Sequence, residues 1–278
     1  MQSDLIIDVG MHIGHDTEFY LAKGFNVVAV EADPDLVKQA EAKFAREIDD
    51  GRLRIFGVAI ADRRGTVQLA VAEESGLNSL SAAEVQRAEK QGARFHYVDV
   101  PAAPFEDILN EVGIPYYLKV DIEGFDKLCV QALHNFDERP PYLSIESSIK
   151  SAEHRLGFDE IFEELAELWT LGYRRFKYLN QMRVPPMPDP PLEGWHFAQP
   201  TPGAASSGPF GRETPGKWEP VERTIVRGWA LRIQHEFGAR YGRWANLPPG
   251  LLYRGLRSRV LRSPTGFFDL HARLDSVE

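Results

Sequence analysis

Short apolar runs alternate with amphipathic stretches through the first 180 residues of the chain. Three runs near the N-terminus, residues 5–9 (LIIDV), 25–33 (FNVVAVEAD) and 53–60 (LRIFGVAI), are rich in β-branched residues and have the length of strands. Runs with so little polar alternation are typical of strands buried on both faces of a parallel sheet. Helical patterns follow the first two runs, in residues 15–23 and 34–48.

The alternation continues downstream. Expected strands are residues 65–71, 95–102, 116–124, 141–146 and 172–179, and expected helices are residues 105–113, 126–136 and 158–169. Strands that alternate with helices of about 10–15 residues indicate an α/β protein with a mostly parallel sheet and helices on both faces. In such sheets ligands bind beyond the carboxyl ends of the strands, so polar residues at those ends are the candidate functional residues.

The composition changes after residue 180, where the chain becomes rich in Pro, Gly and Ser. We therefore expect a main domain at residues 1–190 and a C-terminal extension at residues 191–278. Helical periodicity returns in residues 221–243, with a stripe of apolar side chains made of Val226, Trp229, Ile233, Phe237, Tyr241 and Trp244. We expect this stripe to pack on the core and the basic face to be solvated. The alternatives are a lid, a homodimer arm or a membrane-surface patch. No fold is assigned to the last thirty residues.

Charge and composition narrow the classes of partner. The chain carries a net charge of −9, and residues 201–278, with 12 Lys+Arg and 7 Asp+Glu, account for +5, which leaves −14 on residues 1–200. Such an acidic body argues against nucleic acid, because phosphate contacts need a basic surface. No apolar run reaches the length of about 18 residues that a membrane span requires. The single cysteine, Cys129, and the lack of a signal-peptide pattern lead us to expect a cytoplasmic protein.

The first strand ends in a loop, Asp8-Val9-Gly10-Met11-His12-Ile13-Gly14, which has two glycines and an acid. It lacks the middle glycine of a dinucleotide-binding loop and the Gly-Lys-Ser/Thr of a P-loop. Asp8 would repel phosphate but suits a ligand that carries positive charge. Glu31 ends the second strand, 17 residues after Gly14, where a carboxylate can accept hydrogen bonds from both hydroxyls of a ribose. This order of residues is found in S-adenosylmethionine (SAM) binders, although a plain strand–turn–helix would also use the glycines.

Two further groups of residues have candidate roles. Lys119, Asp121 and Glu123 alternate near the end of one expected strand and would point to the same side, and Glu146 ends the next. Asp121 is the preferred general base, with Glu123, Glu146 and His12 as alternatives. Asp121 and Glu123 could instead hold Mg²⁺, or the carboxylates could simply pair with Lys119 at the rim of the sheet. A metal on His12 and His15 is disfavoured, because the i, i+4 spacing with an intervening Glu is absent. Candidate substrate contacts are Asn78, Ser79 and Lys119.

Six segments resemble the FkbM-type SAM-dependent methyltransferases, in the order found in that family and over residues 4–180. These segments are IIDVGMHIGHDTEFYLAKG, VVAVEADP, FGVAIADRRGTVQLAV, GLNSL, YYLKVDIEGFDKLCVQAL and PPYLSIE. The resemblance implies a Rossmann-like seven-stranded fold and transfer of a methyl group from SAM to a hydroxyl of a sugar or natural product.

The resemblance also implies a set of cofactor contacts. It places the methyl-transfer site near Asp121. Glu31 would contact the ribose. Val58 and Ala59 would lie near the adenine. The other cofactor contacts would be Asp8, Gly10, His12, Gly14, Thr17 and Ala32. His12 departs from the Asn that the family commonly has. The alternatives are an NAD(P)-dependent oxidoreductase, or a non-catalytic SAM-binding module that acts through its basic tail.

Overall fold

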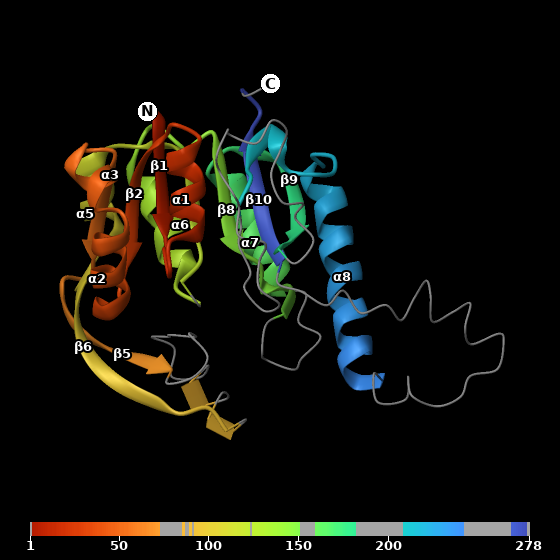
Figure 1. Ribbon diagram of the computed structural model, residues 1–278. Helices are drawn as coiled ribbons and strands as arrows, with labels where there is room; N and C mark the ends of the chain where they lie inside the picture. The colour runs from red at the N-terminus through yellow and green to blue at the C-terminus, as the bar shows by residue number, and fades with distance from the viewer. Residues whose placement is uncertain are drawn as a thin grey trace.

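The computed structural model describes residues 2–72, 85–86, 89–90, 92–122, 124–150, 159–181, 208–241 and 268–276. Within these residues a seven-stranded sheet forms the centre of the molecule, in the order β3-β2-β1-β7-β8-β10-β9 (Figure 1). Its strands are β1 (Gln2–Val9), β2 (Asn26–Glu31), β3 (Leu53–Gly57), β7 (Pro115–Val120), β8 (Tyr142–Glu146), β9 (Tyr173–Asn180) and β10 (Phe268–Leu274). Only β10 runs antiparallel to its neighbours, so the predicted mostly parallel α/β sheet is confirmed.

Helices cover both faces of the sheet, which explains the continuous apolar runs. One face packs against α5 (Phe105–Val112), α6 (Asp126–Ala132), α7 (Asp159–Thr170) and α8 (Val221–Tyr241), and the other against α1 (His15–Ala22), α2 (Pro34–Lys43) and α3 (Ala45–Asp49). In β1, Ile7 and Val9 face the first layer while Ile6 faces the second, and all three are buried. Asp33 caps α2 by accepting hydrogen bonds from the N–H groups of Asp35 and Leu36. Short 3₁₀ turns lie at Leu133–Asn135 (η1), Ser148–Lys150 (η2) and Gly211–Glu213 (η4).

A second, three-stranded sheet has the order β4-β6-β5, with β4 at Ala59–Ile60, β5 at Gly65–Ala72 and β6 at Phe95–Ala103. It lies on the side of the main sheet where the parallel strands end (Figure 1). The prediction of one strand over residues 53–60 was therefore wrong: the chain leaves the main sheet after Gly57 and enters the second sheet at Ala59. The apolar pattern runs through this change of sheet without a break, because Ala59 is buried against Leu69 and Val100.

The C-terminal extension contributes directly to the main sheet. We assigned no fold to the last thirty residues, yet β10 lies between β8 and β9 and pairs with both. Its sequence FDLHARL alternates apolar and polar residues, as a strand does, and this signal was missed. Another part of the extension, residues 208–218, covers the face of β7 and β8 beside α1. Its Phe210 stacks on Tyr117 at a centroid distance of 4.1 Å, and Trp218 packs near Tyr142. The described residues 208–218 and 268–274 of the extension thus pack on or within the domain expected at 1–190.

Helix α8 occurs where helical periodicity predicts it, but it packs through a different face from the one we expected. Val226, Trp229 and Ile233 of the apolar stripe are 64%, 38% and 39% exposed. The buried face instead contains Thr224, Gly228 and Arg232. A Cβ on Gly228 would lie 2.7 Å from the Tyr178 hydroxyl, so the small residue lets the helix approach β9. Arg232 donates to Glu160 and to the carbonyl of Ser148, both at 2.9 Å, which satisfies its buried charge.

No helix within the described ranges combines the length and the apolar character that a membrane crossing needs.

Candidate functional site

The loop after β1 lies at the point where the strand order of the main sheet reverses, between β2 and β7. Its backbone is fixed on both sides: the N–H of Gly10 donates to the Val30 carbonyl at 2.9 Å, and the N–H of Asp121 donates to the Val9 carbonyl at 2.9 Å. A Cβ on Gly10 would lie 1.9 Å from the carbonyl oxygen of Asp121, and Gly10 has φ of +84°. Glycine is therefore required here for both conformation and space.

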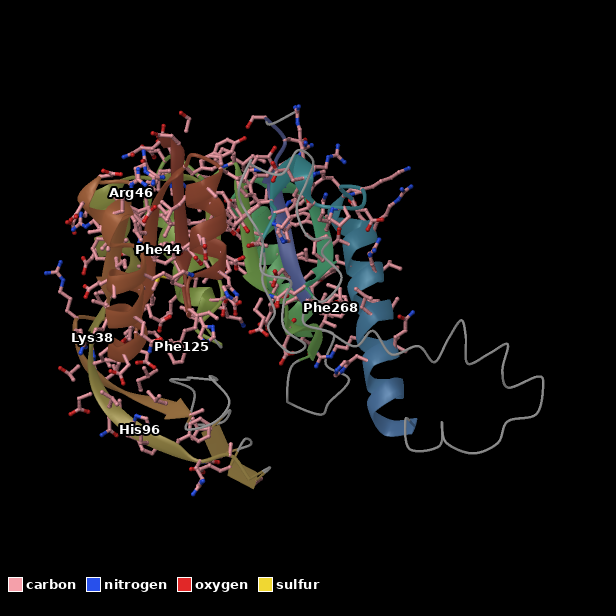
Figure 2. All side chains as sticks on the ribbon, viewed as in Figure 1. Lys38, Phe44, Arg46, His96, Phe125 and Phe268 are labelled. Atoms are coloured by element: carbon pink, nitrogen blue, oxygen red, sulfur yellow. The ribbon has the colours of Figure 1, made fainter. Side chains whose placement is uncertain are left out.

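Two more residues give the loop its shape. Gly14 has φ of +75°, and a Cβ there would lie 2.7 Å from the ring of Phe44, a side chain labelled in Figure 2. His12 has φ of +53°, and among the described residues it alone combines a side chain with a positive φ. His, Asn and Asp adopt this left-handed conformation more readily than other residues with side chains. His12 therefore fits the backbone conformation that an Asn would also adopt, which accounts for the replacement of the family's common Asn by His12.

Glu31 fastens the loop to the end of β2. Its Oε2 accepts a hydrogen bond from the N–H of His12 at 2.7 Å, and its Oε1 accepts from the N–H groups of Ala32 and Asp33, both at 2.9 Å. Burial raises the pKa of Glu31, although the three backbone donors act to lower it. A carboxylate offers about four acceptor positions, so one on Oε2 is left for a ligand hydroxyl.

A buried ionic network supports the loop from below. The ammonium of Lys119 lies 3.0 Å from Asp8 Oδ1, 3.5 Å from Asp16 Oδ2 and 3.4 Å from the Gly10 carbonyl. Thr17 donates from its hydroxyl to Asp8 Oδ2 at 2.7 Å. Burial acts to lower the pKa of Lys119, but Asp8 and Asp16 raise it well above the ordinary range. Asp8, Thr17 and Lys119 are each at most 3% exposed, so they form the floor of the site.

Sequence reasoning missed Asp16, which joins this network to the C-terminal extension. Its Oδ1 accepts a hydrogen bond from the N–H of Gly208 at 2.8 Å, and the Gly208 carbonyl accepts from the hydroxyl of Tyr20 at 3.2 Å. An acid in the first turn of a helix is ordinarily explained by the helix dipole. Nothing in the local pattern connects it to a residue almost two hundred positions away.

Two of the candidate catalytic residues, Asp121 and Glu146, lie at the same edge of the sheet. Asp121 directly follows β7, which ends at Val120, so it does not continue the strand alternation that we expected from Lys119. Partial burial and Lys119 lower the pKa of His12, while Asp121 acts in the opposite direction, so the two side chains share one electrostatic environment. Glu146 ends β8 opposite Asp269 of β10. Glu123, Asn78 and Ser79 lie outside the described residues.

The side chains predicted near an adenine ring lie next to β2 and β3. Gly57 pairs with Glu31 across these strands, so Val58 and Ala59 follow directly at the carboxyl edge. Ala59 is 2% exposed and belongs to a small apolar cluster against which Ala32 packs. Among the residues that the structure places, no group of three or more His, Cys, Asp or Glu side chains is arranged to hold a metal ion.

Comparison with known proteins identifies the family. The model of the methyltransferase FkbM domain matches residues 8–175. Among solved structures, Methyltransferase FkbM from Methylobacillus flagellatus KT is 17% identical with a TM-score of 0.42, and the match covers 64% of this chain and 40% of that chain. A precorrin-6y C5,15-methyltransferase from Geobacter metallireducens GS-15 is 10% identical with a TM-score of 0.34, covering 65% and 70%. The chain thus spans about two fifths of the first protein, and no curated protein sequence matches it. The family match, which includes the loop, Glu31 and Asp121, shows that this chain belongs to the FkbM methyltransferase family.

Proposed function

We propose that the protein binds SAM at the carboxyl edge of β1, β2 and β7 and transfers its methyl group to a hydroxyl oxygen of a sugar or natural-product acceptor. The observation that carries this proposal is the placement of Gly10 against the Asp121 carbonyl, with Glu31 on the adjacent strand. This is the switch point of the sheet, where ligands of doubly wound folds bind.

The residues at this edge fit the parts of SAM. The free acceptor position of Glu31 suits a ribose hydroxyl, and the absence of a side chain at Gly10 lets the loop lie directly against the Asp121 backbone, which fixes the loop beside Glu31. Ala32, Val58 and Ala59 provide apolar contacts for an adenine ring. Asp8 and Thr17 are expected to contact the cofactor and Lys119 the substrate. Because these three side chains are buried and bonded to one another, we assign them to holding the loop in shape.

The loop after β1 and Glu31 would hold SAM beside the acceptor, and a side chain would have to take the proton of the acceptor hydroxyl as it is methylated. Bound SAM supplies an electrophilic methyl group and a neutral thioether leaving group. We assign Asp121 to accept the hydroxyl proton, a role that contributes about 10²–10⁴-fold to the rate. The lowered pKa of His12 keeps its imidazole neutral near pH 7, so His12 is the alternative acceptor of that proton.

Calorimetry with SAM and with NADH separates this proposal from the oxidoreductase alternative. We expect binding of SAM, and the opposite preference would overturn the assignment. Labelled SAM incubated with small-molecule extracts then identifies the acceptor, and the absence of transfer to any of them would favour the non-catalytic module. Loss of transfer on EDTA treatment, restored by Mg²⁺, would require a metal in the mechanism.

The role of Asp121 is tested by Asp121→Asn, which keeps the size of the side chain and removes the base. We expect kcat to fall at least a hundredfold while the affinity for SAM changes less than about threefold. Asp137→Asn is the matched control, because Asp137 is exposed and precedes β8, at the opposite edge of the sheet. Turnover of Asp121→Asn equal to that of the control would refute the assignment.

A further inference from the structure

Residues 208–218 of the C-terminal extension, called the covering segment below, lie on the face of the main sheet next to α1. Phe210 anchors this segment: it is 7% exposed and stacks on Tyr117 of β7 at a centroid distance of 4.1 Å. The rings of Tyr20 and Tyr142 meet it edge-on, each at 6.0 Å. Stacked and edge-on aromatic pairs contribute stability beyond the area that they bury. The covering segment is thus attached to the domain by specific packing.

The first residue of the covering segment bonds to α1, the helix that follows the loop after β1. The N–H of Gly208 donates to Asp16 Oδ1 at 2.8 Å, and the Gly208 carbonyl accepts from the Tyr20 hydroxyl at 3.2 Å. Asp16 and Tyr20 are one helical turn apart in α1, so their side chains lie on the same face of the helix. Asp16 is 7% exposed and Tyr20 is fully buried, so water does not compete for these bonds. Gly208 therefore bonds to buried groups of α1 at two points.

Asp16 also reaches the ionic network beneath the loop. Its Oδ2 lies 3.5 Å from the ammonium of Lys119, which donates to Asp8 Oδ1 at 3.0 Å and to the Gly10 carbonyl at 3.4 Å. The network contains two carboxylates and one ammonium, so one negative charge is formally in excess. Such an excess below the loop favours a cofactor that carries positive charge, as the sulfonium of SAM does. One side chain thus connects the extension on one side with the loop on the other.

The orientation of the Asp16 side chain depends on the covering segment. Because the two oxygens of its carboxylate have different partners, one orientation satisfies both Gly208 and Lys119. Without Gly208, the carboxylate loses a charge-assisted hydrogen bond and is held less firmly in that orientation. The Lys119 ammonium can then move toward Asp8 and away from the Gly10 carbonyl. A displacement of the segment is therefore transmitted to the loop.

We propose that Asp16 is a positioning residue through which docking of the covering segment raises the affinity of the loop for SAM. The inference rests on the proposed function, because its ligand is SAM. Linkage makes the effect reciprocal, so bound SAM must hold the covering segment in place by the same factor. Couplings of this kind usually amount to about 5–150-fold in affinity. Cofactor binding then depends on a segment that follows Asp16 by almost two hundred residues.

Calorimetry with SAM on the full chain measures this coupling. Phe210→Leu removes the stacking on Tyr117 but keeps an apolar side chain, and it should weaken SAM binding at least about fivefold. Asp16→Ala should also weaken SAM binding at least about fivefold. When both substitutions are combined, Phe210→Leu should cost less than about a further twofold, because the connection to the loop is already lost. Losses that multiply in the double variant would overturn the proposal.

Two control variants separate this effect from general destabilisation. Phe176 of β9 is fully buried in the layer on the other face of the sheet, and Glu164 of α7 has a buried carboxyl oxygen. Phe176→Leu and Glu164→Gln should each change the affinity for SAM less than about twofold, and a fivefold loss in either would count against the proposal. Thr214→Val removes the hydroxyl that accepts from Lys177 at 2.9 Å. It loosens the covering segment at another point and should act in the same direction as Phe210→Leu.

Hydrogen exchange supplies a readout that destabilisation alone would not reproduce. Without SAM, Phe210→Leu should speed exchange of the amides of residues 10–14 at least about threefold relative to Phe176→Leu. In the wild type, SAM should slow exchange of the amides of residues 208–218 at least about fivefold, whereas in Asp16→Ala it should slow them less than about twofold. Equal exchange of residues 10–14 in the two Phe variants, or equal protection by SAM in wild type and Asp16→Ala, would refute the coupling while the proposed function stands. Absence of SAM binding by the wild type would overturn the proposed function and this inference together.

Discussion

Substitution of Lys119 by Met tests the buried network beneath the loop. Methionine keeps much of the lysine stem but removes the ammonium that lies 3.0 Å from Asp8 and 3.5 Å from Asp16. Asp8 is fully buried and Asp16 is 7% exposed, so water cannot replace the lost cation. Removal of one partner from a buried ion pair costs about 3–5 kcal/mol. We expect the free energy of unfolding of Lys119→Met to fall by that amount at pH 8.

The loss in free energy of unfolding caused by Lys119→Met, called the deficit below, should depend on pH. Burial already raises the pKa of Asp8, and loss of Lys119 raises it further. A carboxyl group with a raised pKa in the folded state contributes stability that is fully present below its unfolded pKa and is lost as pH rises through the folded pKa. Asp8 of the variant therefore takes up a proton at a higher pH than in the wild type, and the deficit should shrink between pH 8 and pH 5.

Urea denaturation followed by circular dichroism at pH 5, 6.5 and 8 measures the effect. The double variant Asp8→Asn/Lys119→Met should regain at least about 1 kcal/mol relative to Lys119→Met, because it removes the unpaired buried charge. Lys38→Met, at an exposed position of α2, is the control and should stay within about 0.5 kcal/mol of wild type. A deficit under about 1 kcal/mol at pH 8, or one that is equal at pH 5 and pH 8, would refute the reasoning.

Three further predictions concern other residues. Gly10→Ala places a Cβ against the Asp121 carbonyl and should weaken SAM binding at least tenfold by calorimetry, whereas Gly24→Ala, which shares a positive φ but meets no atom within 4 Å, should not. His12→Asn should keep SAM affinity within about threefold, whereas His12→Val should lose it, because a β-branched residue is strained at φ of +53°. Burial raises the pKa of Glu164 to about 7, so the wild type loses stability as pH rises from about 4.5 to 7. Relative to wild type, the free energy of unfolding of Glu164→Gln, measured by urea denaturation, should rise by up to about 3 kcal/mol at pH 8 and by little at pH 4. An equal gain at both pH values would contradict this.

Sequence alone predicted the layered architecture because the patterns that indicate strands, helices and turns are local. Apolar runs such as residues 5–9 are buried on both faces. Gly10 directly follows one strand and Glu31 is the last residue of the next, and the hydrophobic pattern already places both strands. The family match over residues 8–175 rests on these same segments.

What the sequence did not predict depends on distant contacts. In β10 apolar residues alternate with Asp269, His271 and Arg273, which is a strand pattern, but nothing in this pattern places the strand between β8 and β9. Burial of Asp269 is compensated by Gln181, 88 residues earlier, which donates to it at 2.6 Å. The orientation of α8 likewise follows from the partner of Arg232, and periodicity carries no information about partners. Pairing across the fold decided each of these outcomes.

The position of β10 makes the protein separable into two pieces. Without residues 268–274, β8 and β9 would each present an unpaired edge, and such edges accept an added strand. A chain cut between α8 and β10 should therefore recover its sheet when the last strand is supplied as a peptide. The strand peptide and the rest of the chain would then form a split methyltransferase, and the assembly of the two fragments could be measured as recovered SAM binding.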